Sequence, residues 1–320
     1  MMMHLALYQR VWRVYTNSIG GDSIAGRLGI AREADLGLGT TFERFAIYGW
    51  LESVASRYAI HTVLEGPGDG VAGIPGIHGI PLAQKGCRVT VTLDNLAGVT
   101  LARRAWSAQG CLDQGDFVCV RGLPLPLLSR RFDLVWNFNR LPFLNPAALA
   151  AEMARLSRRY VALVVPNRRN YGFPARRLFH ARTGLPWPYG DTAVMTPGAV
   201  RELLEQAGLR ILETRWLDVP WWPDIIDPVA WLKAMIPGAS RLLARNQRDG
   251  DRRDGYRWRP DDLPYFDQAA YADVHQRMRR LGWMERAWPS LLQIPFAHHF
   301  AVLAEILSHV REGPGEGQDA

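Results

Sequence analysis

The segment TVLEGPGDGVAGIPGIHG, residues 62–79, decides how this chain folds. It holds six glycines and two prolines in eighteen residues, and the apolar pair Val63 and Leu64 with the carboxylate Glu65 stand directly before the first glycine. Glycine lets a ligand approach the backbone closely and tolerates positive φ angles. A strand that ends in such a turn and leads into a helix presents free N–H groups at the carboxyl edge of a sheet. We therefore predict a ligand-binding turn here.

Helical and strand patterns alternate on both sides of this turn. Before it, TTFERFAIYGWLESVASRYAI (40–60) carries apolar residues at helical spacing, with Thr40 or Thr41 as the expected N-cap. Later, TPGAVRELLEQAG (196–208) has Thr196 as N-cap, Pro197 at the first helical position and Gly208 as a stop signal.

Seven segments of the chain have strand patterns, several of them rich in β-branched residues. They are IHTVLEGP (60–67), CRVTVTLDN (87–95), DFVCVRG (116–122), Phe132 to Trp136, YVALVVPN (160–167), LRILETRWLDV (209–219) and FAHHFAVLAEIL (296–307). Helical segments separate most of them. This order predicts an α/β fold with a doubly wound, mainly parallel sheet.

Two classes of ligand use a glycine-rich turn of this kind. Gly68, Gly70 and Gly73 satisfy the G-x-G-x-x-G pattern of dinucleotide sites, and Asp94 follows at a suitable distance to bind a ribose. However, Asp69 would bring negative charge to a pyrophosphate. S-adenosylmethionine has no phosphates, and its ammonium group suits an acid such as Glu65. The residues before the glycines therefore favour the sulfonium nucleoside.

The order of five segments resembles that of the class I S-adenosylmethionine-dependent methyltransferases. VLEGPGDG is similar to the first motif of that family, and GCRVTVTLDN to its second strand with the ribose-binding acid. LPLPLLSRRFDLVWNFNRLPFL resembles its fourth-strand region, MTPGAVRELLEQAGLRILET its late helix and sixth strand, and AHHFAVLAEI its final strand. The resemblance implies a seven-stranded, Rossmann-like sheet whose last strand is antiparallel.

The resemblance also implies a set of cofactor-binding residues. These are Glu65, Gly66, Gly68, Gly70, Asp94 and Asn137. The sequence differs from the family pattern in two places. Glu65 is followed at once by glycine, and the loop is enlarged by VAGIPG. The residue that contacts adenine is not assigned, because Arg121 and Gly122 stand where the family often has an acid.

No catalytic residue is assigned from the sequence. Methyl transfer from a sulfonium depends mainly on positioning, and a general base helps only where the acceptor loses a proton. His180, Tyr189 and Asp191 follow the fifth strand, where acceptor contacts are expected. His298 and His299 lie in the final strand, where packing is the more common role of a histidine. No group of residues has the spacing of a metal site.

Charge and composition limit the classes of partner that we expect for the chain. The net charge of +7 over 320 residues comes almost entirely from arginine, and no nucleic-acid-binding module is recognisable. Three cysteines without paired spacing fit a reducing cytoplasm. No transmembrane helix is expected. The first fifteen residues could form an amphipathic helix, so peripheral membrane contact stays open, as does the oligomeric state.

We expect four regions along the chain. Residues 1–60 form an N-terminal helical segment, and residues 61–219 with 290–310 form the nucleoside-binding domain. Residues 220–289 are an insertion rich in tryptophan and proline that serves as a lid, acceptor-binding or interface subdomain. Residues 311–320 are a disordered tail.

Three functions are consistent with these patterns. The first is a methyltransferase that uses S-adenosylmethionine and an apolar or aromatic small-molecule acceptor. The second is an NAD(P)-dependent oxidoreductase that uses Gly68, Gly70 and Gly73. The third is a non-catalytic nucleoside-binding scaffold with the same fold. The acid before the glycines, Asp94 and the order of the later strands favour the first.

Overall fold

A seven-stranded sheet forms the centre of the protein. The computed structural model describes residues 34–68, 73–120, 122–184, 186–224 and 255–307. The strand order is β4-β3-β2-β5-β6-β9-β7, with β9 antiparallel to both of its neighbours and the adjacent pairs from β4 to β6 parallel. The predicted mainly parallel sheet with an antiparallel last strand is confirmed. The strands are β2 (Thr62–Glu65), β3 (Arg88–Leu93), β4 (Gly115–Cys119), β5 (Phe132–Phe138), β6 (Ser157–Pro166), β7 (Leu209–Leu217) and β9 (His299–Ile306).

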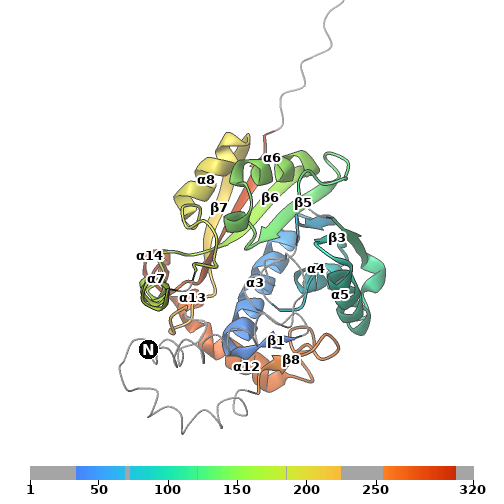
Figure 1. Ribbon diagram of the computed structural model, residues 1–320. Coiled ribbons are helices and arrows are strands. Elements are labelled where there is room, and N and C mark those ends of the chain that lie inside the picture. The colour runs from blue at the N-terminus through green and yellow to red at the C-terminus, as the bar shows by residue number, and fades with distance from the viewer. Residues whose placement is uncertain (1–33, 69–72, 121, 185, 225–254, 308–320) are drawn as a thin grey trace, which may run out of the picture.

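Helices cover both faces of this sheet and enclose two hydrophobic cores (Figure 1). One core lies under α3 (Gly37–Arg57), α4 (Ile80–Gln84) and α5 (Leu96–Ala108), and the other lies under α6 (Pro146–Leu156) and α8 (Pro197–Gln206). Successive strand residues point to opposite faces. Val63 therefore belongs to the first core and Leu64 to the second.

Side-chain caps begin three of the helices. Asn95 accepts a hydrogen bond from the Gly98 N–H at 2.8 Å at the start of α5, and Asn145 does the same for α6. Thr196 caps α8 as predicted, with Pro197 at the first helical position. Such caps satisfy backbone N–H groups that have no partner within the helix.

The predicted N-cap of α3 is wrong. The helix begins at Gly37, ahead of Thr40 and Thr41, and it has no side-chain cap. The Gly37 N–H instead donates to the Tyr256 carbonyl at 2.8 Å, and the Thr41 hydroxyl accepts from Trp258 Nε1 at 2.8 Å. A tertiary contact that is distant in sequence therefore replaces the local cap.

Asp133 joins the first residues of two neighbouring parallel strands. Its Oδ2 accepts hydrogen bonds from the backbone N–H groups of His61 and Thr62 at 3.0 and 2.9 Å, and its Oδ1 accepts from Arg158 Nε at 2.7 Å. The side chain is buried. Asp133 therefore has a structural role at the start of β5.

A short strand of the expected N-terminal segment pairs with a short strand of the expected insertion. β1 (Asp35–Leu36) lies antiparallel to β8 (Arg257–Trp258) in a two-stranded sheet. The described part of residues 220–289 also contains α12 (Ala272–Leu281) and α13 (Trp283–Ala287), and α14 (Ser290–Gln293) follows. The predicted helix at the N-terminus, much of the insertion and the predicted tail lie outside the described residues.

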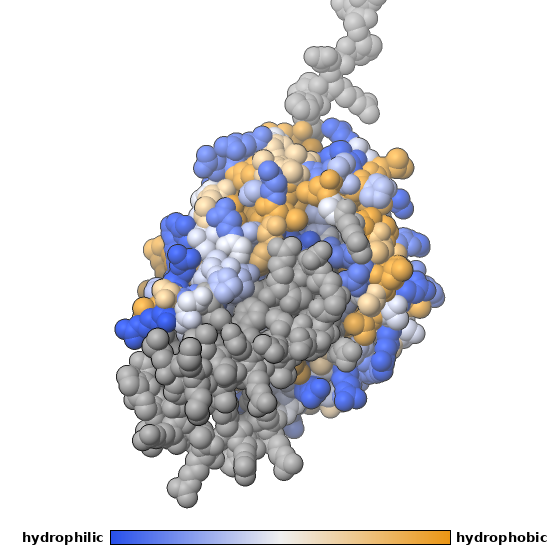
Figure 2. Space-filling view, in the orientation of Figure 1, coloured by the Kyte–Doolittle hydropathy of each residue, from blue (hydrophilic) through white to orange (hydrophobic). Residues whose placement is uncertain are grey.

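The helix α7 (Gly172–Thr183), which follows β6, was not predicted. Among the residues described, no helix combines the length and the apolar character needed to cross a bilayer. On the surface, apolar and charged residues lie side by side over the visible described part of the molecule (Figure 2).

Candidate functional site

The glycine-rich turn lies against the end of β3. The Gly66 N–H donates to the Trp136 carbonyl at 3.0 Å, and a Cβ at Gly66 would overlap Thr92 Oγ1. The Gly68 N–H donates to the same Thr92 hydroxyl at 3.0 Å, and Gly68 has a φ of 71°. Glycine is therefore required at both positions, at one by close contact and at the other by backbone conformation.

Asp94 and Asn137 lie beside this turn. The Asp94 carboxylate accepts a hydrogen bond from Arg140 Nη1 at 3.0 Å. The Arg140 guanidinium packs over Gly68, 2.8 Å from where a Cβ would stand. Asn137 donates to the Pro67 carbonyl at 3.2 Å and accepts from the Arg140 N–H at 3.2 Å. The ends of β2, β3 and β5 thus form one connected surface.

Glu65 is buried at the end of β2. Its side chain is 3 % exposed, and Oε2 is 3.1 Å from where a Cβ at Gly79 would stand. Gly79 immediately precedes α4, so the carboxylate lies under the beginning of that helix. Gly70 falls outside the described residues. The structure therefore brings together Glu65, Gly66, Gly68, Asp94 and Asn137, and their binding role stays a prediction.

Gly73 has a different role from the glycines before it. Its φ is 76°, and a Cβ there would overlap Asp35 Oδ1. The same oxygen accepts a hydrogen bond from the Ile74 N–H at 3.1 Å. The enlarged loop is thus bound to the segment that precedes α3.

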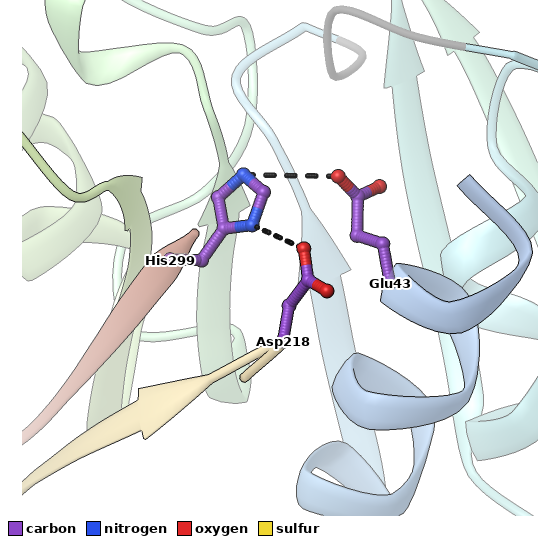
Figure 3. Close-up of side chains that lie close together, drawn as sticks. All are labelled: Glu43, Asp218 and His299. Atoms are coloured by element: carbon purple, nitrogen blue, oxygen red, sulfur yellow. Dashed lines mark ion pairs between the residues drawn. The ribbon is translucent and has the colours of Figure 1, made fainter. Parts of the chain in front are cut away.

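A second group of polar side chains lies at the same edge of the sheet. It consists of Glu43 from α3, Asp218 directly after β7, and His299 at the start of β9 (Figure 3). His299 Nδ1 lies 3.3 Å from Asp218 Oδ2, and His299 Nε2 lies 3.7 Å from Glu43 Oε2. We call these three residues the edge cluster. Within the described part of the chain, they are the one group of His, Cys, Asp or Glu side chains close enough to share a metal ion.

The topology of the sheet explains how the edge cluster forms. Because β9 is antiparallel, its first residue pairs with the last residues of β6 and β7, Pro166 and Leu217. Asn139, one residue beyond β5, reaches the same place, with its Nδ2 3.1 Å from His299 Nε2. In the strand order, β5 and β6 lie between β2 and β9, and Asn139 reaches the edge cluster from the end of β5, the strand next to β2.

Further charged groups surround the edge cluster. His298 Nδ1 lies 3.1 Å from Asp218 Oδ2. On the other side, the fully buried Arg44 contacts Glu43 Oε1 at 2.6 Å and Asp35 Oδ2 at 3.0 Å. Asp35 also accepts a hydrogen bond from the Tyr265 hydroxyl at 2.8 Å.

Burial and charge shift the pKa values of these groups in different directions. Burial raises the pKa of Glu43, and the positive charge of Arg44 offsets only part of this. Burial alone would also raise the pKa of Asp218, but the charges and hydrogen bonds of His298 and His299 together outweigh burial and lower the pKa. Burial alone would lower the pKa of His298, but Asp218 raises it to about 9. Asp218 and His298 are therefore an ion pair at neutral pH.

Two of the residues expected near the acceptor, His180 and Tyr189, belong to a group of packed rings after β6. The His180 ring packs edge-on against Trp187 and Tyr189, with ring centroids 5.4 and 5.8 Å away. Burial raises the pKa of Tyr189 to about 12, so its phenol stays neutral. The Asp191 N–H donates to the Pro142 carbonyl at 2.7 Å. Their contact with an acceptor stays a prediction.

Sequence reasoning did not single out the edge cluster. Histidines in the final strand were expected to pack, and Glu43 lies in a helix far away in sequence. One signal was present. An Asp at the end of one strand, followed by a His pair at the start of its antiparallel neighbour, places these side chains at one edge of a sheet.

Several solved structures are similar to this chain at low sequence identity. No protein-family model matches the chain, and no curated protein matches it significantly. Similar solved structures include the cyclase SpnF, with 17% identity over 81% of this chain and 80% of that one and a TM-score of 0.44. Another is the geranyl diphosphate C-methyltransferase from Streptomyces coelicolor A3(2), with 10% identity, coverage of 81% and 78%, and a TM-score of 0.44.

A S-adenosylmethionine-dependent methyltransferase from Aquifex aeolicus is also similar, with 17% identity over 52% of this chain and 83% of that one and a TM-score of 0.38. The strand order and the inserted antiparallel strand give this chain the Rossmann-like fold of the class I S-adenosylmethionine-dependent methyltransferases. A fold of this kind carries more than one function, so the function has to be argued from the site.

Proposed function

We propose that this protein is a methyltransferase that transfers a methyl group from S-adenosylmethionine to a small-molecule acceptor. The observation that carries the proposal is the surface formed by the Gly66–Gly68 turn, Asp94 and Asn137 at the carboxyl ends of β2, β3 and β5. Ligands of doubly wound sheets bind at this edge. The edge cluster is linked to this surface through Asn139, which precedes Arg140 and contacts His299, and we propose that an acceptor approaches there.

The residues of this surface fit an adenosyl group. Gly66 and Gly68 let the turn pack closely against Thr92 and Arg140, and Asp94 is an acceptor for ribose hydroxyls at the end of the next strand. Glu65 would attract the ammonium group of the ligand. When bound, S-adenosylmethionine supplies an electrophilic methyl group on a positively charged sulfur.

Gly73 argues against a dinucleotide. In the alternative function, this glycine would be the third of the pyrophosphate-binding pattern. It instead packs against the buried ion pair of Asp35 and Arg44, which fills the space beside it. The contact supports the methyl donor over NAD(P).

The position of Arg140 keeps open the alternative function of a non-catalytic scaffold. Its guanidinium occupies the space over Gly68 and binds Asp94 Oδ2. An adenosyl ligand would have to share the carboxylate with this guanidinium or displace it. A protein that binds no nucleoside would keep the ion pair instead.

Calorimetric titration of the full chain tests the proposal. We expect heat of binding with S-adenosylmethionine and with S-adenosylhomocysteine, and none with NADH. Binding of NADH alone would establish the oxidoreductase alternative. Binding of none of the three would refute a nucleoside site at this edge of the sheet.

A further inference from the structure

We propose that one face of the protein docks on a membrane surface that contains anionic lipids. The face comes from the segments that follow β6 and β7 and from helices α13 and α14. Its large apolar side chains are exposed, and we call it the docking face: Tyr171, Trp221, Trp283, Leu291 and Leu292. None of these residues belongs to the cofactor-binding surface at the ends of β2, β3 and β5, so the inference does not rest on the proposed function.

The side chains of the docking face are largely open to solvent. Leu291 and Leu292 on α14 are 79 % and 55 % exposed, and Trp221 and Trp283 are 63 % and 48 % exposed. An exposed apolar side chain that stands alone is common in proteins. A contiguous group of such side chains instead marks an interaction surface. The contacts among these residues therefore decide whether they form a surface.

A row of contacting rings connects the docking face. The Trp283 ring packs against Trp288 with centroids 5.5 Å apart, and Trp288 packs against Phe296 at 5.2 Å. Phe296 in turn packs against Tyr171 at 5.4 Å, and the Tyr171 hydroxyl donates to the Trp221 carbonyl at 2.6 Å. The helix α14, which carries both leucines, lies between Trp288 and Phe296 in the chain. Because α7, α13 and α14 lie at the same side of the molecule (Figure 1), these segments form one continuous surface.

Arginines border the docking face. Arg286 follows Trp283 by three residues on α13, so the two side chains are neighbours on the helix surface. The Arg286 guanidinium donates to the Arg279 carbonyl, and Arg279, Arg280 and Arg286 are all exposed. Glu285 is the one acidic residue in the sequence of α13 and α14, and burial raises its pKa to about 7. Positive charge therefore predominates at this edge of the face.

An anionic bilayer fits this combination of side chains. Tryptophan and tyrosine prefer the boundary between lipid headgroups and acyl chains, leucine adds apolar area that the bilayer buries, and arginine is attracted to anionic headgroups. A symmetric dimer through the same face would bring two positively charged surfaces together, because each copy presents the same residues. That repulsion favours a lipid surface over a second copy of the chain.

Co-sedimentation of the full chain with vesicles tests lipid binding. We expect the protein to bind vesicles made of equal parts of phosphatidylcholine and phosphatidylglycerol about 10-fold or more tightly than vesicles of phosphatidylcholine alone. Added salt should weaken the binding, because it screens the attraction between arginines and headgroups. Equal binding to the two kinds of vesicle, or binding to neither, would overturn the proposal.

Substitution of the exposed leucines tests which face binds the vesicles. Leu291→Ser combined with Leu292→Ser should weaken binding about 10-fold or more, because less apolar surface enters the bilayer. Leu128→Ser combined with Leu307→Ser is the matched control, since these leucines are 74 % and 51 % exposed and belong to other segments. Equal losses in the two double variants would show that the docking face has no special role.

Substitution of the arginines tests the charge separately. Arg279→Ala combined with Arg280→Ala should weaken binding to the mixed vesicles about 10-fold or more. Arg130→Ala combined with Arg131→Ala, at another pair of consecutive exposed arginines, should leave binding unchanged. Binding that both double variants retain would refute the charge complementarity on which the proposal depends.

Analytical ultracentrifugation without lipid separates the bilayer from a second copy. We expect the wild type and the variant with both Leu291→Ser and Leu292→Ser to sediment alike, because the face is free in the absence of vesicles. A wild-type dimer that these two substitutions dissociate would overturn the proposal in favour of an interface between two copies.

Discussion

Arg140 shows how one side chain can link several parts of a site. Its backbone N–H is held by Asn137, its guanidinium packs over Gly68, and it binds the carboxylate of Asp94. The Asp94 side chain is 19 % exposed, so it is accessible to a ligand. The Arg140 contact thus positions the carboxylate at the edge of the site.

Replacing Asp94 tests its proposed role in nucleoside binding. We expect Asp94→Ala to weaken binding of S-adenosylhomocysteine by about 1–3 kcal/mol, because two hydrogen bonds to ribose hydroxyls are lost. Calorimetry measures the change. Asp113→Ala, at an exposed aspartate, is the matched control. Equal affinities of the two variants would show that Asp94 does not bind the ligand.

The ion pair of His298 and Asp218 predicts how stability changes in alkaline solution. The pKa of His298 is raised to about 9 in the folded protein, from an ordinary value of 6.5. Its contribution is therefore complete below pH about 6.5 and is lost as pH rises through 9. We expect a loss of about 3 kcal/mol over this range, measured by thermal unfolding. In His298→Gln the melting temperature should fall less between these pH values, and an equal fall would contradict the assignment.

At the scale of elements, Asp133 holds together the starts of β2 and β5. We expect Asp133→Asn to destabilise the fold by about 2–3 kcal/mol, because an amide cannot accept all of the hydrogen bonds and loses the charge that faces Arg158. Urea unfolding measures the difference. Asp116→Asn, in the more exposed pair with Arg88 on β3, should cost about 1 kcal/mol or less. Similar losses in both variants would refute the structural role of Asp133.

The pattern of elements was largely predictable from the sequence, and its exceptions have physical causes. Strands and helices follow from local periodicity, and the cap of α8 follows from Thr196 and Pro197. The start of α3 could not be predicted, because its first N–H binds Tyr256. The short β1 was missed for the same reason, since a two-residue strand depends on its distant partner.

The candidate site was predictable only in part. The glycine turn and Asp94 are close in sequence and belong to adjacent strands, so their meeting followed from the strand order. The edge cluster combines α3 with the ends of β7 and β9. Only the three-dimensional arrangement shows that Glu43 approaches His299.

At the scale of the whole molecule, Asp35 and Arg44 connect regions that are distant in sequence. Both side chains are fully buried, and Asp35 also contacts Ile74 of the enlarged loop and Tyr265 of the expected insertion. The Asp35–Arg44 pair thus connects the N-terminal segment to the enlarged loop and to the expected insertion.

Breaking this pair should destabilise the whole fold. We expect Arg44→Ala to lower the free energy of unfolding by about 3–5 kcal/mol, because Asp35 is left as an uncompensated buried charge. Chemical denaturation measures the change. Asp35→Asn combined with Arg44→Ala should cost less than the sum of the two single changes. Arg57→Ala, in the exposed pair with Glu213, should cost about 1 kcal/mol or less. Strict additivity of the first two changes would contradict their pairing.

The position of β9 affects how the protein is made in the cell. Within the described sheet, β7 is paired with β9 alone, so β7 has no partner until the last strand has been synthesised. At roughly 5–20 residues per second, the ribosome takes about 4–16 s to advance from Leu217 to His299. During that time the edges of β6 and β7 stay open, and open strand edges promote aggregation. A chain released before β9 keeps those edges exposed to chaperones and proteases, so the sheet closes only after β9 has been synthesised.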